Sequence, residues 1–201
     1  MALEFKKEMD KKTGRKKDDT CPWDYVMMFL ANMTDEGITI LPTHRLVKGL
    51  KGNNIFRKLE SDFAISKLPK TGDFLQTLSK AGNNVFGFYI DREEGWYILK
   101  YKKDSLNDIH PALKNLDVVV LHELILKRNL GIIDIAYEMD AAGAIEKIRS
   151  GDFDGVFFLN PTKITDVERV AMSHLRMPPK STYFYPKLLT GMVINSFINN
   201  T

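Results

Sequence analysis

Two apolar runs around a polar turn constrain the fold of this chain more than any other feature. Val85–Ile90 and Trp96–Tyr101 are rich in β-branched and aromatic residues, and the turn between them ends at Gly95. Two such runs on either side of a short polar turn predict a β-hairpin. The fold therefore contains at least one antiparallel pair of strands.

Further strands and helices are predicted to alternate along the rest of the chain. The other strands are expected at Trp23–Met33, which we interpret as buried, Ile38–Leu41, Phe63–Ser66, Ile132–Tyr137, Phe153–Leu159 and Gly191–Phe197. The helices are expected at 2–12, Phe56–Glu60, Asp73–Lys80, Val118–Asn129 (ending at Gly131), from the N-cap Asp140 to Arg149, and from Thr162 or Thr165 to about Ser173. This order predicts a mixed α/β or α+β class, with a mixed sheet, hairpins and flanking helices.

Charge argues against a nucleic-acid partner. The chain has a net charge of +3, with a hydrophobic fraction of 44% and a charged fraction of 27% that are typical of a soluble globular protein. Most of the net charge belongs to the lysine-rich start of the chain, so the remainder is nearly neutral. Nucleic-acid affinity rests on many phosphate contacts. A broad nucleic-acid surface is therefore disfavoured, whereas a small basic pocket remains open.

Cysteine usage and hydropathy point to the cytoplasm. Cys21 is the only cysteine, so an internal disulfide and a multi-cysteine metal site are excluded. We favour a structural role for it over that of a nucleophile. No apolar run approaches the ~18 residues of a membrane span, and the charged N-terminus does not resemble a secretory signal. A reducing cytoplasm is the expected compartment.

The proline-rich run Met177–Leu188 is the first candidate site. Its three prolines stiffen a segment that carries two lysines, two hydroxyls and three aromatic rings. Ammonium and hydroxyl groups can hold an anion, because charge-assisted hydrogen bonds to phosphate are strong. The ligand-binding residues expected here are Lys180, Ser181, Thr182, Tyr185 and Lys187.

Lys180-Ser181-Thr182 has the residue order that ends a P-loop, but the segment is not one. A P-loop needs Gly-x-x-x-x-Gly before its lysine, so that free amides wrap the phosphates. Here Pro178 and Pro179 precede Lys180, and a proline offers no amide hydrogen. A Walker site is excluded. The alternative to an anion site is an extended structural segment whose rings alternate between core and surface.

His44 and Arg45 are the second candidate, because they follow a Pro-Thr turn at a strand end. Loops carry binding residues more often than cores do. A histidine can act as acid or base near neutral pH, and an arginine can clamp a phosphate with two parallel hydrogen bonds. We expect His44 to be catalytic and Arg45 to bind substrate. The alternative is a histidine bonded within its turn beside a surface arginine.

Two further polar positions carry weaker signals. His122-Glu123 lies in an apolar helix, and Leu126 stands where a zinc motif would place a second histidine, so a structural pair is favoured and no metal site is predicted. Asn160 ends a strand that leads into a helix. Its amide could orient a ligand, since ligands in α/β sheets often bind at strand ends.

Four motifs in order resemble a known family. They are Ile40–Val47, His122-Glu123, Phe157–Thr162 and Met177–Leu188, and together they are similar to the uncharacterised bacterial and archaeal family called domain of unknown function 1015. The resemblance implies a ParB-like fold, which includes nucleotide-hydrolysing proteins and small-molecule kinases. The association of the family with serine biosynthesis implies serine or phosphoserine as a ligand.

The chain departs from the family pattern at its start. Full members carry a motif like Asp-Gly-His-His-Arg-Tyr-Glu-Thr just before the helix that begins here at Ala2, and this chain lacks it. The resemblance therefore implies the C-terminal part of a longer fold, from a truncated or split gene. We expect residues 1–20 to form a helix and a linker, and residues 21–201 to form a single α+β domain.

The favoured hypothesis is a domain that binds a small phosphorylated or carboxylated metabolite. In the complete protein, this binding would support phosphoryl transfer or phosphate-ester hydrolysis, which depends mostly on positioning and charge neutralisation. Mg²⁺ and a nucleotide are the cofactors that such chemistry would use, although no metal motif is visible.

The alternative is a non-catalytic C-terminal half that completes the fold of a ParB-like partner segment. An N-terminal segment or a second chain would then carry the missing motif, and Phe5, Met9 and Trp23 would lie at the seam. A severed interface exposes apolar surface, so this hypothesis predicts self-association of the chain alone. No membrane partner is expected.

Overall fold

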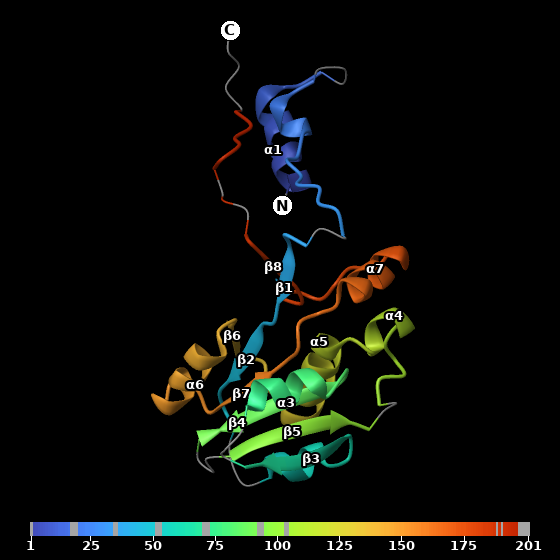
Figure 1. Cartoon of the computed structure of the whole chain (residues 1–201). Coiled ribbons are helices and arrows are strands. Elements are labelled where there is room, and N and C mark those ends of the chain that lie inside the picture. Colours follow the sequence, from blue (N-terminus) through green and yellow to red (C-terminus); the bar gives the residue numbers. More distant parts are fainter. Residues whose placement is uncertain are drawn as a thin grey trace. The chain divides into compact units, whose positions relative to one another are not determined.

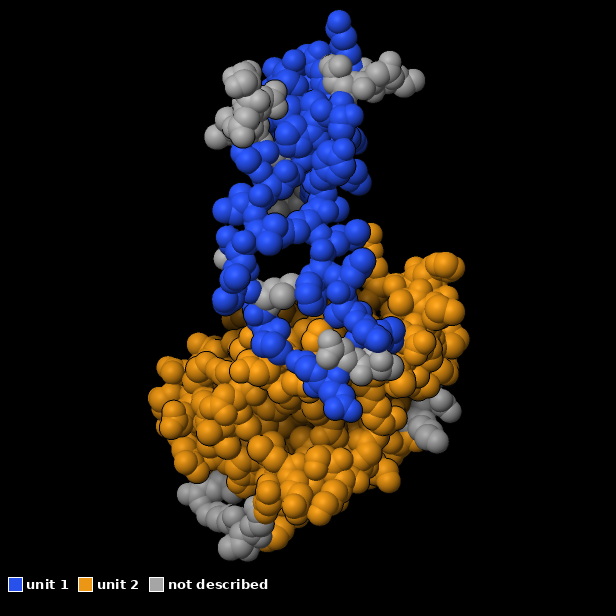
Figure 2. Space-filling model, turned by 45° about the horizontal axis from the view of Figure 1, so that its top comes forward, with its two compact units in different colours: residues 1–37, 186–201 blue, residues 38–185 orange. Residues whose placement is uncertain are grey.

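The computed structural model describes residues 2–16, 20–33, 36–50, 54–69, 73–91, 95–102, 105–187, 189 and 191–196. The chain divides into two compact units (Figure 2), one of residues 1–37 with 186–201 and one of residues 38–185. Residues 21–37 thus group with the N-terminal helix, whereas a single domain is expected over residues 21–201. That expectation concerns independent folding and stays a prediction.

The larger unit is built on a six-stranded sheet (Figure 1). Its strands, in spatial order, are β3 (Phe63–Leu68), β5 (Gly95–Tyr101), β4 (Val85–Ile90), β7 (Gly155–Phe158), β2 (His44–Val47) and β6 (Ile135–Glu138). Every pairing among these strands is antiparallel, which is simpler than the mixed sheet that the sequence predicts. The α+β class is confirmed.

The predicted hairpin is confirmed as β4 and β5, whose pairing runs from Val85 opposite Lys100 to Ile90 opposite Gly95. Residues 92–94 of its turn lie outside the described residues. β4 and β7 lie at the centre of the sheet and are buried along their whole length. Continuous apolar sequence therefore marks the strands that are covered on both faces.

Helices cover the two faces of the sheet. α2 (Ile55–Leu59), η3 (Val120–Leu130) and α7 (Ile164–Met172) contribute to the core on one face, where the Phe88 and Phe157 rings stack with centroids 4.5 Å apart. α3 (Phe74–Lys80) and α6 (Ala141–Arg149) contribute to the core on the other face. Successive residues of a strand therefore point into two different cores.

The helix predicted at Val118–Asn129 is present, but most of it has π geometry. α4 (Pro111–Lys114) and α5 (Asp117–Val119) precede the π-helix η3, which ends at Gly131 with φ +67°. Gly131 adopts this left-handed conformation without the steric cost that a β-carbon would add. π-Helical segments occur frequently at functional sites.

The strands predicted at Ile38–Leu41 and at Gly191–Phe197 have opposite outcomes. Ile38–Leu41 is confirmed as β1 (Thr39–Leu41), which pairs with β8 (Tyr183–Tyr185) in a second, two-stranded sheet. The strand predicted at Gly191–Phe197 is wrong for residues 191–196, which form no strand, and Phe197 lies outside the described residues. Strands β6 and β7 are shorter than predicted, beginning at Ile135 and Gly155.

The predicted N-cap at Asp140 is confirmed, and Asp73, predicted as part of its helix, caps α3 in the same way. The Asp73 and Asp140 carboxylates accept backbone N–H bonds at the starts of α3 and α6. The prediction that Thr162 or Thr165 caps α7 is wrong, because the N-cap is Lys163, which makes no side-chain cap bond. The Thr162 hydroxyl instead donates to the Ser181 carbonyl.

We expect Asp140→Ala to lower the free energy of unfolding by about 1 kcal/mol, because the amides of Ala142 and Gly143 lose their acceptor. Lys163→Ala, at a cap without a side-chain bond, should change it by less than about 0.5 kcal/mol. Urea unfolding of both variants measures the difference. Equal midpoints for the two variants would contradict the capping assignment.

The smaller unit contains α1 (Ala2–Thr13) and a short 3-10 helix, η1 (Pro22–Asp24). The helix predicted at 2–12 is confirmed. Asp24 forms ion pairs with Lys6 and Arg15, and the Trp23 indole N–H donates to Asp10. These bonds hold the 3-10 turn against α1.

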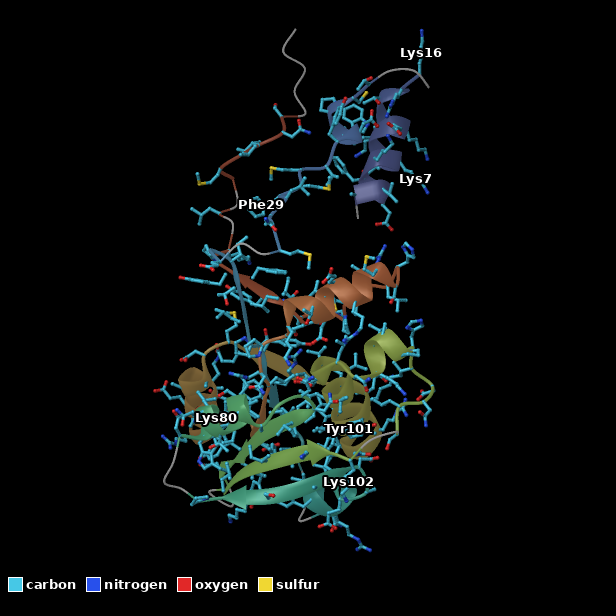
Figure 3. All side chains as sticks on the ribbon, turned by 45° about the vertical axis from the view of Figure 1, so that its right-hand side comes forward. Lys7, Lys16, Phe29, Lys80, Tyr101 and Lys102 are labelled. Atoms are coloured by element: carbon cyan, nitrogen blue, oxygen red, sulfur yellow. The ribbon has the colours of Figure 1, made fainter. Side chains whose placement is uncertain are left out.

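The buried strand predicted at Trp23–Met33 is wrong. Tyr25–Leu30 has neither helix nor strand, and its large side chains are 60–86% exposed, including Phe29 (Figure 3). An apolar run becomes a buried strand only where neighbouring strands supply hydrogen bonds and a covering layer. This segment pairs with none of the strands in the described part of the chain.

Candidate anion-binding site

Arg45 is a buried cation in the larger unit. It is the second residue of β2 and only 1% exposed. Its Nε–H donates to His122 Nε2 (3.2 Å), an Nη1–H donates to the Thr43 carbonyl, and an Nη2–H donates to the Lys180 carbonyl (3.0 Å). All three acceptors are uncharged, so these bonds do not neutralise the guanidinium.

No carboxylate among the described residues lies within 4.0 Å of the Arg45 guanidinium. Burial lowers the pKa of Arg45 to about 10, which still leaves the group charged at neutral pH. A guanidinium has five N–H donors, and three are used here, so each terminal nitrogen keeps one. Since an uncompensated buried charge is costly, an anion at this point would stabilise the structure.

Tyr137 and Lys180 lie on the same side of the sheet as Arg45. Tyr137 is opposite Arg45 in β6, and its ring centroid is 5.5 Å from Arg45 Cζ and 5.9 Å from Lys180 Nζ. A cation over an aromatic face gains about 0.5–1 kcal/mol at exposed sites and about 2 kcal/mol when desolvated, but the ring has no net charge. The ring thus brings two positive charges near one another without neutralising either.

A tight turn, Pro178–Ser181, which we call the strap, covers Arg45. The Ser181 hydroxyl and amide both donate to the Pro178 carbonyl, and Thr162 Oγ1 donates to the Ser181 carbonyl (2.7 Å). Lys180 lies in the strap with φ +58°, a left-handed conformation that is uncommon for residues other than glycine. The prediction of a rigid, non-helical segment here agrees with this bonding.

His122 belongs to this cluster, although the sequence favours a structural role for it. Because its Nε2 accepts from Arg45, its proton lies on Nδ1 and the ring is neutral. Burial, and then the charge of Arg45, lowers the pKa of His122 to about 4. The pairing joins residues far apart in the chain, and no local pattern indicates it.

The side chain of His44 does not lie on the same face of the sheet as that of Arg45. The expected loop is a strand, and adjacent strand residues point to opposite faces of a sheet. The His44 ring packs on Phe158, 4.8 Å between centroids, and its Nδ1 accepts a long bond from the Leu159 amide (3.5 Å). Burial, then the charge of Arg45, lowers its pKa to about 4. Its role as an acid or base stays a prediction.

The other predicted site residues are dispersed. Asn160 donates to the carbonyls of Leu78 and Gly82 at the end of α3, so its amide donors serve the fold. Thr182 is half-buried beside the strap, and Tyr185 is exposed in β8. Lys187 is exposed and belongs to the smaller unit. Of the predicted residues, the structure brings together Arg45, Lys180 and Ser181.

We expect stability to fall as pH falls from 6.5 to 4. The folded-state pKa values of His44 and His122 are about 4, below the ordinary 6.5, so the unfolded chain binds more protons in this range. Asp117 opposes them, because burial raises its pKa to about 6 and the folded chain then binds the extra proton. Two histidines outweigh one aspartate.

Urea unfolding between pH 7.5 and 4 measures this dependence. His122→Gln keeps an acceptor for Arg45 but cannot titrate, so its stability should fall less steeply than that of the wild type. Asp117→Asn removes the opposing group, and its stability should fall more steeply. Identical pH profiles for the wild type and His122→Gln would refute a neutral, buried His122.

The chain belongs, by its sequence, to a family of unknown function. Residues 1–119 match the family described as "Protein of unknown function (DUF1015)", and the chain is a member of it. The predicted family is thereby confirmed. The ParB-like fold and the missing N-terminal motif stay predictions. No curated protein matches the chain.

Solved structures show a partial likeness. A conserved hypothetical protein from Pyrococcus furiosus shares 17% identity with a TM-score of 0.48, over 77% of this chain and 59% of that one. A free serine kinase in complex with AMP shares 15% identity with a TM-score of 0.48, over 77% of this chain and 56% of that one. The chain thus spans less than 60% of the length of either protein.

The described residues contain neither a cluster of metal-binding side chains nor a candidate membrane span. They contain no group of three or more His, Cys, Asp or Glu side chains that could hold a metal ion. None of their helices is long and apolar enough to cross a membrane.

Proposed function

We propose that the larger unit binds a small metabolite that carries a phosphate or carboxylate group. The observation that carries this proposal is the buried guanidinium of Arg45, whose three acceptors are all neutral. Lys180, which shares the Tyr137 ring with Arg45, adds a second positive charge. A bound oxyanion would receive the two unused N–H groups of Arg45.

In the complete family protein, this binding would support phosphoryl transfer or phosphate-ester hydrolysis. Serine or phosphoserine is the ligand class that we favour. Ser181, Thr182 and Tyr185 would orient the ligand. The His44 side chain lies on the opposite face of the sheet and the Asn160 amide bonds to α3, so we assign neither of them a role at Arg45. The described residues do not form a Mg²⁺ site, so no step through a metal or a nucleotide is derived. We place the chain in the cytoplasm.

Thermal unfolding against a ligand panel tests the proposal. The panel comprises phosphoserine, serine, ATP, ADP and pyrophosphate at constant ionic strength, with and without Mg²⁺. A ligand at a hundred times its dissociation constant adds about 2.7 kcal/mol to stability, or about 2–4 °C for each kcal/mol in a chain of this size. A cooperative transition that no ligand shifts would contradict an intact site in this chain.

The exposed segment Tyr25–Leu30 favours a second candidate function. Consecutive large apolar side chains that are mostly exposed mark an interaction surface. This segment would complete the fold of a partner that carries the Asp-Gly-His-His-Arg motif, on an N-terminal segment or a second chain. Sedimentation of the chain alone should then show self-association, which Val26→Lys with Phe29→Lys abolishes. A monomer at every concentration would contradict this candidate.

A further inference from the structure

The site is closed in this structure. Arg45 is only 1% exposed, so a ligand cannot reach its guanidinium unless a neighbouring group moves. The strap is that neighbour, because the Lys180 carbonyl occupies an N–H of Arg45 Nη2.

The closed strap is tied to the rest of the unit by hydrogen bonds and has one residue in a strained conformation. Its contacts to the rest of the unit include the bond from Arg45 to the Lys180 carbonyl and the bond from Thr162 to the Ser181 carbonyl. Lys180 has φ +58°, a left-handed conformation that is unfavourable for residues with a β-carbon. Opening the strap would relieve this strain and so offset part of the two lost hydrogen bonds.

An anionic oxygen is a better acceptor for Arg45 than the Lys180 carbonyl. The bond from Arg45 to the Lys180 carbonyl is charged on one side only, whereas a carboxylate or phosphate also neutralises the guanidinium and can accept two parallel bonds from it. After the strap lifts, Nη2 has two free N–H groups and Nη1 has one.

We propose that the strap is a gate. One oxygen of the ligand's phosphate or carboxylate group replaces the Lys180 carbonyl on Arg45 Nη2, and this replacement opens the strap. The inference rests on the proposed function and adds a closed ground state to it. The ligand class that fits has two oxygens on one anionic group, which bridge Nη1 and Nη2 of Arg45.

Thr162→Val tests the gate without altering Arg45 or Lys180. The Thr162 hydroxyl holds the strap from outside it, so its loss weakens the closed state alone. Titration calorimetry with O-phosphoserine should show binding roughly three- to tenfold tighter than in the wild type. This factor corresponds to the net free energy of one hydrogen bond. Thr77→Val is the matched control, because its hydroxyl donates to the Asp73 carbonyl on α3.

Lys180→Gly and Lys180→Ala form a second matched pair. Both remove the ammonium group, but only glycine adopts the left-handed conformation without strain. The closed strap is therefore more stable in Lys180→Gly, and O-phosphoserine should bind it roughly tenfold more weakly than it binds Lys180→Ala.

The outcomes separate the gate from the proposed function. If the wild type binds O-phosphoserine but Thr162→Val binds it no more tightly, the gate is overturned and the anion site stands. Equal affinities for Lys180→Gly and Lys180→Ala would overturn the gate as well. If both Lys180 variants lose all binding, the Thr162→Val result decides. If the wild type fails to bind any oxyanion of the panel, the gate and the proposed function both fail.

Discussion

Arg45→Met should abolish the thermal stabilisation that a phosphate or carboxylate ligand confers, while the protein remains folded. Truncating one partner of a buried, hydrogen-bonded charge pair costs about 2–5 kcal/mol of binding. That is a loss of affinity of roughly 30-fold or more. Methionine fills a similar volume without charge, so the variant separates the guanidinium from its packing.

The stability of the ligand-free Arg45→Met variant reflects two opposing effects. Removing a buried charge recovers its desolvation cost, and such replacements are often neutral or stabilising. The carbonyls of Thr43 and Lys180 and the His122 ring nitrogen lose a donor, at about 1–3 kcal/mol for each group left unsatisfied. We expect a cooperative transition to remain.

Arg57→Met is the matched control for this prediction. Arg57 is exposed on α2, and its replacement removes the same charge from the larger unit. The control should keep the full ligand-induced shift in melting temperature. A ligand that stabilises Arg45→Met as much as the wild type would show that the anion site lies elsewhere.

Phe157→Ala should lower the free energy of unfolding by about 3–5 kcal/mol, the largest loss of stability that we expect from a single substitution. Phe157 is fully buried at the centre of the sheet, and its ring stacks on Phe88 with centroids 4.5 Å apart. It also pairs directly with Arg45 across β2 and β7. The cavity would therefore open beside the candidate site.

Phe184→Ala is the matched control, because Phe184 is 44% exposed in the two-stranded sheet. Its replacement should cost about 1 kcal/mol or less. Urea unfolding at neutral pH compares the two variants. A loss below about 1 kcal/mol for Phe157→Ala would mean that the central strands do not form the core described here.

Features of the fold that depend on residues close together in the sequence could be predicted. The β4–β5 hairpin follows from two apolar runs and a turn, and α3 and α6 begin at aspartates that cap them. The left-handed Gly131 ends η3 where a helix is predicted to stop. Each of these signals acts over a few residues, so chain topology does not alter it.

Burial of an apolar run could not be predicted, because it depends on distant partners. The composition of Tyr25–Leu30 is that of a core strand, yet no described strand pairs with it. The central strand β7 has a similar composition and is fully buried. Strand β7 lies between β4 and β2, and no described strand is hydrogen-bonded to Tyr25–Leu30.

The candidate site depends on contacts that no local motif encodes. Arg45 bonds to His122, although β3, β4 and β5 separate the two residues in the sequence. It also bonds to the strap, which lies near the end of the chain. One part was within reach of the sequence. Had β2 been predicted to begin at His44, strand alternation would have placed His44 and Arg45 on opposite faces.

The most direct test of anion binding at Arg45 is a titration followed by the side-chain Nε–H resonance of this arginine. That proton is buried and donates to His122, so it should exchange slowly with water, and its signal is assigned by its absence in Arg45→Met. We expect the resonance to shift saturably with O-phosphoserine while the backbone amide resonance of Arg57 stays in place. Saturable binding of O-phosphoserine with an unmoved Arg45 resonance would contradict the assignment of the site.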